Sequence, residues 1–132
     1  MPLHVELVSP ERTLLSAEAT MVQARTLGGG DIAFLPGHAP FIGALAIHTV
    51  RIRLTDGREE QAAVHGGFIE VFNDQVKILS DMAELGSQVD VERARRAMER
   101  AEEAIRKGDD AAAVAALARA HARLAAAGHL VS

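Results

Sequence analysis

Residues 75–107 read QVKILSDMAELGSQVDVERARRAMERAEEAIRK, and the hydrophobic period changes within this stretch. Residues 75–79 have the length and composition of a short strand. After Val89, apolar side chains recur at steps of three and four, which is typical of one face of a helix. These side chains are Val91, Ala94, Met98, Ala101 and Ile105. The sequence therefore predicts a boundary between a β part and an α part near residues 85–89.

Upstream of this boundary, apolar and polar residues alternate, as they do in half-buried strands. The alternation is clearest at residues 3–7 and 50–54. Further strands are predicted at about 20–27, 31–35, 62–65, 67–72 and 75–79. Turn-forming residues separate them, and Asp56-Gly57 is the strongest hairpin signal. Many short strands with no helix between them predict an all-β flattened sandwich or barrel of antiparallel strands in residues 1–85.

Downstream, residues 86–132 predict an antiparallel hairpin of two helices, at about 90–107 and 110–127. Asp90 stands where an N-cap carboxylate accepts the free amides of the first helix, and Asp109 or Asp110 can do the same for the second. Eleven of the 17 residues at 111–127 are alanine. Such a helix is intrinsically stable but buries little apolar area. It can therefore detach as a mobile switch, or it can simply be a loosely packed lid.

Composition excludes several classes of function. The 132 residues include no cysteine, which removes disulfides, thiolate catalysis and cysteine-ligated metal centres. The net charge is −4 and there is no Trp or Tyr, so the chain lacks both the basic patch and the stacking surface of a nucleic-acid-binding protein. No apolar run approaches the length of a membrane span, and no basic-then-apolar leader begins the chain. We expect a soluble, non-secreted protein.

Three spaced segments resemble the signature sequences of one family. Residues 30–40, GDIAFLPGHAP, resemble GE(I/L)GILPGHAPL, with Asp31 in place of Glu and Ala33 in place of Gly. Residues 66–71, GGFIEV, resemble GGF-x-EV, and residues 76–84, VKILSDMAE, resemble V-x-IL-A-(D/E)-x-AE. The family is the epsilon subunit of bacterial F-type ATP synthases. The resemblance implies a flattened β-sandwich of about ten strands followed by a two-helix hairpin.

The resemblance also implies a function. A subunit of this kind is a non-catalytic rotor component that binds the gamma subunit, sits on the ring of c subunits and helps to couple proton flow to ATP synthesis. Its hairpin folds down on the sandwich, or extends along gamma towards the alpha and beta subunits and inhibits ATP hydrolysis. The same resemblance assigns Asp31 and His38 to contact with the c-ring. We expect a chain that is monomeric when isolated and lies peripherally on the cytoplasmic face of the bacterial cell membrane.

Residues 89–94, VDVERA, resemble the (I/L)-D-x-x-R-A motif of epsilon subunits that bind ATP without hydrolysing it. Arg93 and Arg100 are seven residues apart on one helix, and Arg119 and Arg123 are four apart on the other, so two pairs of guanidinium groups can clamp a triphosphate. The resemblance implies ATP as a regulatory ligand and leaves the role of Mg²⁺ open. The residues that it assigns to ATP are Glu84, Asp90, Arg93, Ala94, Arg100, Arg119 and Arg123.

Simpler interpretations stay open. Asp90 can act as an N-cap alone, and the arginines can form a solvated helix face paired with nearby glutamates. Arg119 and Arg123 can instead contact the beta subunits when the hairpin is extended. An enzymatic interpretation would gather His38, His48 and His65 around a metal as in cupins, but no H-x-H pair occurs. The alternative function is a free-standing adaptor module with a nucleotide-sensing hairpin.

Overall fold

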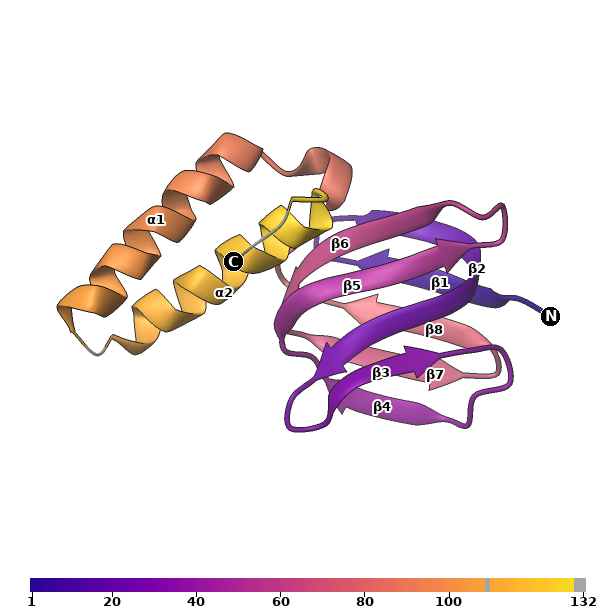
Figure 1. The fold of residues 1–132 in the computed structure, drawn as a ribbon. Coiled ribbons are helices and arrows are strands. Elements are labelled where there is room, and N and C mark those ends of the chain that lie inside the picture. Colours follow the sequence, from indigo (N-terminus) through magenta and orange to yellow (C-terminus); the bar gives the residue numbers. More distant parts are fainter. Residues whose placement is uncertain (109, 130–132) are drawn as a thin grey trace.

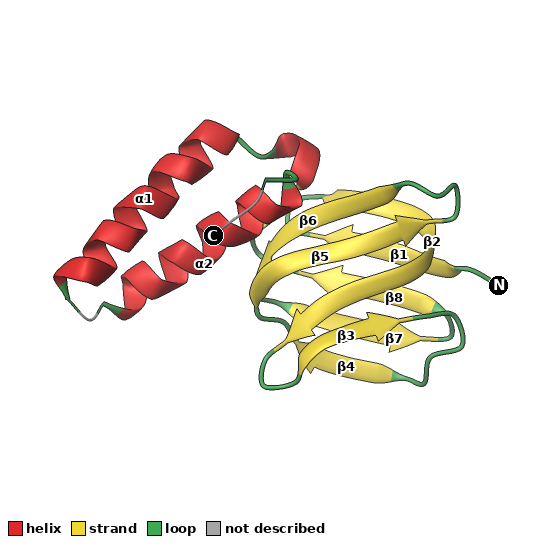
Figure 2. Ribbon diagram, viewed as in Figure 1, coloured by secondary structure: helices red, strands yellow, loops and turns green. Residues whose placement is uncertain are grey.

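The computed structural model describes residues 1–108 and 110–129, which form a β-sandwich followed by a two-helix hairpin (Figures 1 and 2). Within these residues the strands are β1 (Leu3–Val8), β2 (Thr13–Thr26), β3 (Gly30–Phe34), β4 (Phe41–Ala44), β5 (Ile47–Leu54), β6 (Glu59–His65), β7 (Phe68–Phe72), β8 (Gln75–Leu79) and β9 (Ala83–Leu85). A 3₁₀ helix, η1 (Gly86–Gln88), leads to the helices α1 (Val91–Lys107) and α2 (Ala111–Ala126). The predicted fold class is confirmed.

The strands form one hydrogen-bonded sheet that folds over itself. Their order is β4-β7-β8-β1-β2-β5-β6-β9, and β3 pairs with β2. Strand β2 is 14 residues long; its first half pairs with β1 and its second half with β3 and β5, so it joins the two layers. The expectation of antiparallel strands needs one correction, because β1 and β8 are parallel. The long chain segment between β1 and β8 permits this pairing, which a tight turn cannot make.

The core lies between the two layers and follows the alternation read from the sequence. Every second residue of β1, β7 and β8 is buried, and its neighbours face outward. The largest completely buried side chains are Phe34, Leu3, Leu7, Ile52, Ile69 and Ile78. Their packing gives the sandwich its own apolar core, independent of the hairpin.

The strands differ most from the prediction at β2, β4 and β9. Strand β2 begins at Thr13 rather than near residue 20. Strands β4 and β9 were not predicted at all; they are four and three residues long. Neither has a visible alternation, since β4 contains Gly43 and β9 is only AEL. These short strands form because a neighbouring strand supplies hydrogen-bond partners, β7 for β4 and β6 for β9.

The helix caps lie where the sequence places them. Oδ1 of Asp90 accepts a hydrogen bond from the backbone N–H of Arg93 at 3.1 Å, and α1 begins there. Oδ1 of Asp110 accepts from the N–H of Ala112 at 2.9 Å and from that of Ala113. The other predicted cap, residue 109, lies outside the described residues. Both caps satisfy amides that a helix start leaves free.

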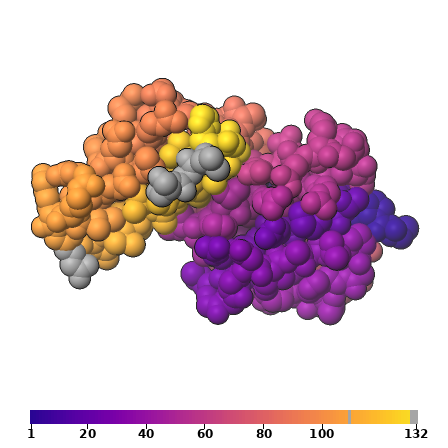
Figure 3. Space-filling model, viewed as in Figure 1, coloured from indigo at the N-terminus to yellow at the C-terminus, as the bar shows by residue number. Residues whose placement is uncertain are grey.

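The hairpin docks on the sandwich mainly through α2. Helix α2 lies on the outer face of β5 and β6, whereas α1 packs against α2 and away from the sheet (Figure 1). The buried apolar cluster at this contact consists of Ala63, Ala122 and Ala126. In Figure 3 the hairpin forms a lobe beside the sandwich. The docking contact is small because alanine offers little area to bury.

No helix in the described part of the chain has both the length and the apolarity needed to cross a bilayer.

Candidate functional site

The site lies where the sandwich meets the hairpin, and an ion pair joins the two parts there. Glu84 is on β9, opposite Ala63 of β6, and therefore points to the face that α2 covers. Nε of Arg123, on α2, lies 2.5 Å from Oε1 of Glu84. Both side chains are partly shielded from solvent, with 25% and 34% of their surface exposed. Partial burial makes the attraction stronger than that of a fully solvated pair.

Beside this ion pair is a pocket of about 400 Å³. Its volume is within the usual range for small-molecule and cofactor sites. The sandwich contributes one wall through β9 and the two helices contribute the others. The lining residues are Glu84, Gln88, Asp90, Arg93, Ala94, Ala97, Arg100 and Arg123. Six of the seven residues predicted to bind ATP thus come together around one cavity.

The pocket carries the charges that an anionic ligand with a polar base requires. Three guanidinium groups line it, from Arg93, Arg100 and Arg123, against the two carboxylates of Glu84 and Asp90. Arginine binds phosphate oxygens through two parallel N–H groups, and carboxylates accept hydrogen bonds from amino or hydroxyl groups. The lining therefore suits a ligand with several negative charges at one end and donors at the other.

Arg119 is the predicted residue that the structure leaves outside the pocket lining. It lies one helical turn before Arg123 on α2, near the end of β6, and its charge acts on His65 there. Helical spacing therefore places the two arginines on one face of α2 but not in one cavity. The docked structure offers three arginines at the pocket rather than four.

Two lining residues were not predicted from the sequence. Gln88 closes η1, where its Oε1 accepts a hydrogen bond from the N–H of Leu85 at 3.3 Å. This bond holds the side-chain amide in place at the pocket wall. Ala97 is one turn beyond Arg93 on α1, where a small side chain leaves room for a ligand. A single glutamine and a single alanine carry no sequence signal that would have identified them.

Asp31 and His38, the predicted c-ring contacts, lie at opposite ends of β3 and are not brought together. Asp31 makes a two-point ion pair with Arg25, at 2.9 and 3.2 Å, which lowers the pKa of this carboxyl group. His38 lies in the turn after β3, where its Nδ1 is 2.7 Å from the carbonyl oxygen of Ala39 and its ring packs on Phe34. The structure explains both residues locally, as a strand-pair contact and a turn contact.

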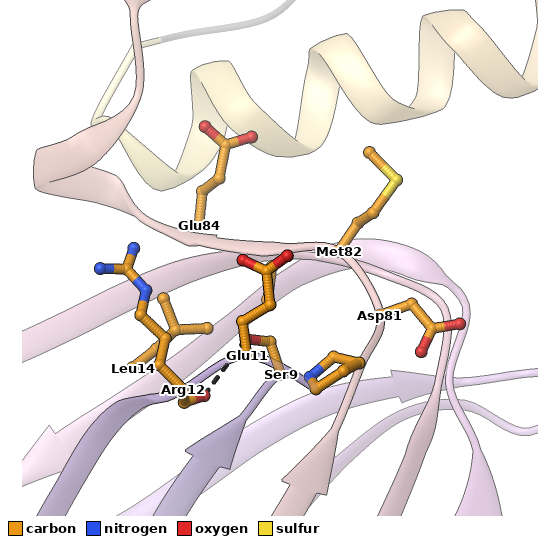
Figure 4. A pocket seen from close by; sticks show the side chains of 9 residues that line it. Ser9, Glu11, Arg12, Leu14, Asp81, Met82 and Glu84 are labelled. Carbon is orange, nitrogen blue, oxygen red and sulfur yellow. Dashed lines mark hydrogen bonds between the residues drawn. The ribbon is translucent and has the colours of Figure 1, made fainter.

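A second pocket, of about 300 Å³, lies on the sandwich side of Glu84 (Figure 4). Its walls come from the β1–β2 turn and the β8–β9 segment, and include Glu11, Arg12 and Asp81. Figure 4 shows the carboxylate of Glu84 pointing away from this hollow, towards a helix. Glu84 therefore belongs to the hairpin pocket in its chemistry, although its backbone borders both.

The histidines do not form the metal site that a cupin-like enzyme would need. Across residues 1–108 and 110–129, no group of three potential ligands is close enough to hold a metal ion. His48 and His65 belong to neighbouring strands but face opposite sides of the sheet, because His48 pairs with Val64 and His65 with Ile47.

Comparison with known proteins identifies the family. Residues 2–86 match the model of the ATP synthase delta/epsilon chain β-sandwich domain, and residues 87–128 match that of the long α-helix domain of the same chain. The ATP synthase epsilon chain of Streptomyces griseus is 50% identical over 96 residues, which cover 73% of this chain and 77% of the relative. The epsilon chain of Moorella thermoacetica is 48% identical over 130 residues, 96% of each chain.

A solved structure has the same fold. A chain of the Euglena gracilis mitochondrial ATP synthase, in a structure of OSCP, F1 and the c-ring, superimposes with a TM-score of 0.82 at 24% identity. The match covers 97% of this chain and 82% of that one. The two family models together span residues 2–128, and both bacterial relatives are epsilon chains. The chain therefore belongs to the ATP synthase delta/epsilon family and is an epsilon-type member of it.

Proposed function

We propose that the chain is a non-catalytic central-stalk subunit of an F-type ATP synthase whose hairpin binds ATP when it is folded down on the sandwich. The observation that carries this proposal is the pocket of about 400 Å³ between β9 and the hairpin, lined by Glu84, Asp90, Arg93, Arg100 and Arg123. Its walls come from both parts of the chain. A ligand that fills it holds the two parts together.

The roles of the residues follow from their charges. Arg93, Arg100 and Arg123 bind the phosphates, because guanidinium groups match phosphate oxygens in geometry and charge. Glu84 and Asp90 accept hydrogen bonds from the adenine amino group or the ribose hydroxyls. Arg119 can bind the phosphates together with these three arginines only if its side chain turns towards the pocket. Ala94 keeps the wall of α1 close to the ligand. ATP is a regulatory ligand here and not a substrate.

ATP binding favours the folded-down hairpin by mass action. If α2 leaves the sandwich, Glu84 stays on β9 while the arginines move with the helices, so the pocket no longer exists. A ligand that binds only one of two states stabilises that state. ATP therefore holds the hairpin down, and the free hairpin extends towards the alpha and beta subunits and inhibits ATP hydrolysis.

The face of the sandwich formed by β4, β7 and β8 has the features of a surface that binds a protein partner. Strands β4, β7 and β8 carry four large apolar side chains that are 41–71% exposed: Ile42, Phe68, Phe72 and Leu79. The strand pairing places Phe68 beside Leu79, and Ile42 opposite Glu70 between the two phenylalanines. Apolar patches of this kind mark protein interfaces. We assign this face to the gamma subunit and retain Asp31 and His38 as candidate contacts of the c-ring, which would hold the chain peripherally at the cytoplasmic face of the membrane.

A calorimetric titration of ATP into the purified chain tests ATP binding. We expect saturable heat with one ATP per chain, weaker or no binding of GTP, and loss of binding in Arg93→Ala. Arg96→Ala is the matched control, since Arg96 is an exposed arginine of the same helix that does not line this pocket. The titration is run with and without Mg²⁺. Absence of heat up to millimolar ATP refutes the nucleotide site.

The alternative, a free-standing adaptor with a nucleotide-sensing hairpin, makes a different prediction. A stalk subunit co-purifies with the gamma, alpha and beta subunits and inhibits ATP hydrolysis by the assembled enzyme. An adaptor does neither. Substitution of Phe68 and Phe72 by serine removes the apolar face without touching the pocket, so loss of gamma binding with ATP binding retained would support both assignments.

A further inference from the structure

His65 lies under the docked hairpin without a hydrogen-bond partner. Only 3% of its side chain is exposed, and neither Nδ1 nor Nε2 has a hydrogen-bond partner within the described residues. It is on β6, on the same face of the strand as Ala63, and that face is covered by α2. Buried polar groups without partners are uncommon in native structures and call for a specific explanation.

The groups around His65 are unfavourable to a second positive charge. Helix α2 contributes Arg119 and Arg123, and β9 contributes Glu84, whose Oε1 is 3.9 Å from Nε2. Strand β5 places the uncharged Ile47 opposite His65. Asp81, in the loop between β8 and β9, lines a surface pocket together with His65. Glu84 is the nearest acid, but Arg123 already binds it at 2.5 Å. These surroundings therefore favour the neutral form of the ring.

We propose that His65 makes the docking of the hairpin sensitive to protons: the hairpin stays down while the ring is neutral and is released when the ring is protonated. This inference rests on the mobile hairpin of the proposed function. The second proton, which gives the ring its positive charge, acts in two ways. It repels Arg119 and Arg123 on α2, and it draws Glu84 away from Arg123, the ion pair that joins the hairpin to the sandwich.

The direction and size of the effect follow from linkage. Burial, the charge of Arg123 and that of Arg119 together lower the pKa of His65 to about 4, against an ordinary value of 6.5, while Glu84 acts in the opposite direction. Undocking exposes the ring and returns its pKa towards 6.5, so the undocked state binds the proton more tightly. Docking is strongest well above pH 6.5 and weakens as pH falls through 6.5 towards 4. Between pH 7.5 and 5.5 the ratio of docked to undocked chains falls about tenfold.

Thiol labelling measures this ratio even when the undocked state is rare. The chain has no cysteine, so Ala63→Cys introduces the single thiol, at a site that is 0% exposed beneath α2. Its rate of modification is divided by that of the same chain in denaturant at the same pH, which removes the titration of the thiol itself. Ala19→Cys, in the sandwich core, reports global unfolding.

We expect labelling of Ala63→Cys to rise about tenfold from pH 7.5 to 5.5, with no comparable rise at Ala19→Cys. His65→Gln, or His65→Asn if the first variant folds poorly, abolishes the rise. His48→Gln retains it, because His48 is also a partly buried histidine of lowered pKa but faces the other side of the sheet. A flat profile, an equal rise at both thiols, or a rise that persists without His65 overturns the inference.

Failure of the inference is distinguishable from failure of the proposed function. Gly86→Ala separates η1 from α2 by a steric clash, and this effect does not depend on the protonation of His65. If this variant labels faster at Ala63→Cys but pH has no effect, the hairpin is mobile and only the role of His65 is wrong. If Gly86→Ala has no effect either, the hairpin does not leave the sandwich and the proposed switch fails.

Discussion

Replacement of Gly86 by alanine tests how the hairpin is held down. Gly86 begins η1 and lies against the C-terminal end of α2. A Cβ atom at this position would be 2.0 Å from the carbonyl oxygen of Ala126 and 3.3 Å from that of Gln61. A carbon and an oxygen normally approach no closer than about 3.3 Å. Gly86→Ala must therefore separate η1 from the end of α2 by about 1.3 Å.

The loss of docking free energy can be worked out from the contacts that the C-terminal part of α2 makes with the sandwich. Oγ1 of Thr49 donates a hydrogen bond of 3.1 Å to the carbonyl oxygen of Ala122, and a shift of this size breaks it at a cost of about 1 kcal/mol. A methyl group forced into a packed site costs about 1–3 kcal/mol more. We expect docking to weaken by about 2–4 kcal/mol, which lowers the docked-to-undocked ratio roughly 30-fold or more.

Labelling of Ala63→Cys at pH 7.5 measures the change. Gly108→Ala is the matched control on the same hairpin, because a Cβ at Gly108 meets nothing within 4 Å. We expect Gly86→Ala to accelerate labelling roughly 30-fold or more, with Gly108→Ala unchanged, whereas ATP binding weakens only to the extent that the docked fraction itself falls. Equal labelling of the two variants would mean that the steric push does not release the hairpin, and would refute the proposed switch.

Three further substitutions test single contacts. Thr49→Val removes the hydroxyl that bonds Ala122 and should weaken docking by about 1 kcal/mol, seen as roughly fivefold faster labelling of Ala63→Cys; an unchanged rate would show that this bond is not needed. Asp90→Ala removes the N-cap of α1 and should cost about 1 kcal/mol of helix stability in thermal melts followed by circular dichroism, whereas Asp90→Asn should retain the cap. Asp31→Asn breaks an exposed ion pair with Arg25 whose stabilisation is present at neutral pH and is lost as pH falls through the lowered pKa of Asp31; a change above about 1 kcal/mol at pH 7 would contradict this picture.

The fold could be predicted wherever a local pattern decides the structure. Alternation predicts β1 and β8, because apolar and polar residues alternate along both segments and every second residue is buried. Asp90 and Asp110 predict the helix starts, because an N-cap acts on the next three residues. Strands β4 and β9 could not be predicted from a local pattern. Their residues become strands only because β7 and β6 offer an edge to pair with.

The site was predictable in part, for a related reason. Helical spacing identifies residues that share a face, and Arg93 and Arg100 do lie together at the pocket. It does not identify which residues share a cavity, because Arg123 lines the pocket beside Glu84 and Arg119 does not. The alternation of β6 predicts that His65 points outward. Nothing local shows that a helix from the other end of the chain covers it.

Because α2 docks through alanine side chains, the docking contact is weak enough for the two proposed signals, ATP and protons, to shift it. ATP at ten times its dissociation constant adds about 1.4 kcal/mol to docking, and protonation of His65 between pH 7.5 and 5.5 removes about the same amount. The contact itself rests on Ala63, Ala122 and Ala126, one hydrogen bond and one ion pair. An interface spaced to bury leucines in place of these alanines would contribute about 1.5–3 kcal/mol for each side chain, more than either signal can offset. A switch operated by one nucleotide and one proton requires an interface this weak, because a ligand shifts an equilibrium only by its difference in affinity for the two states.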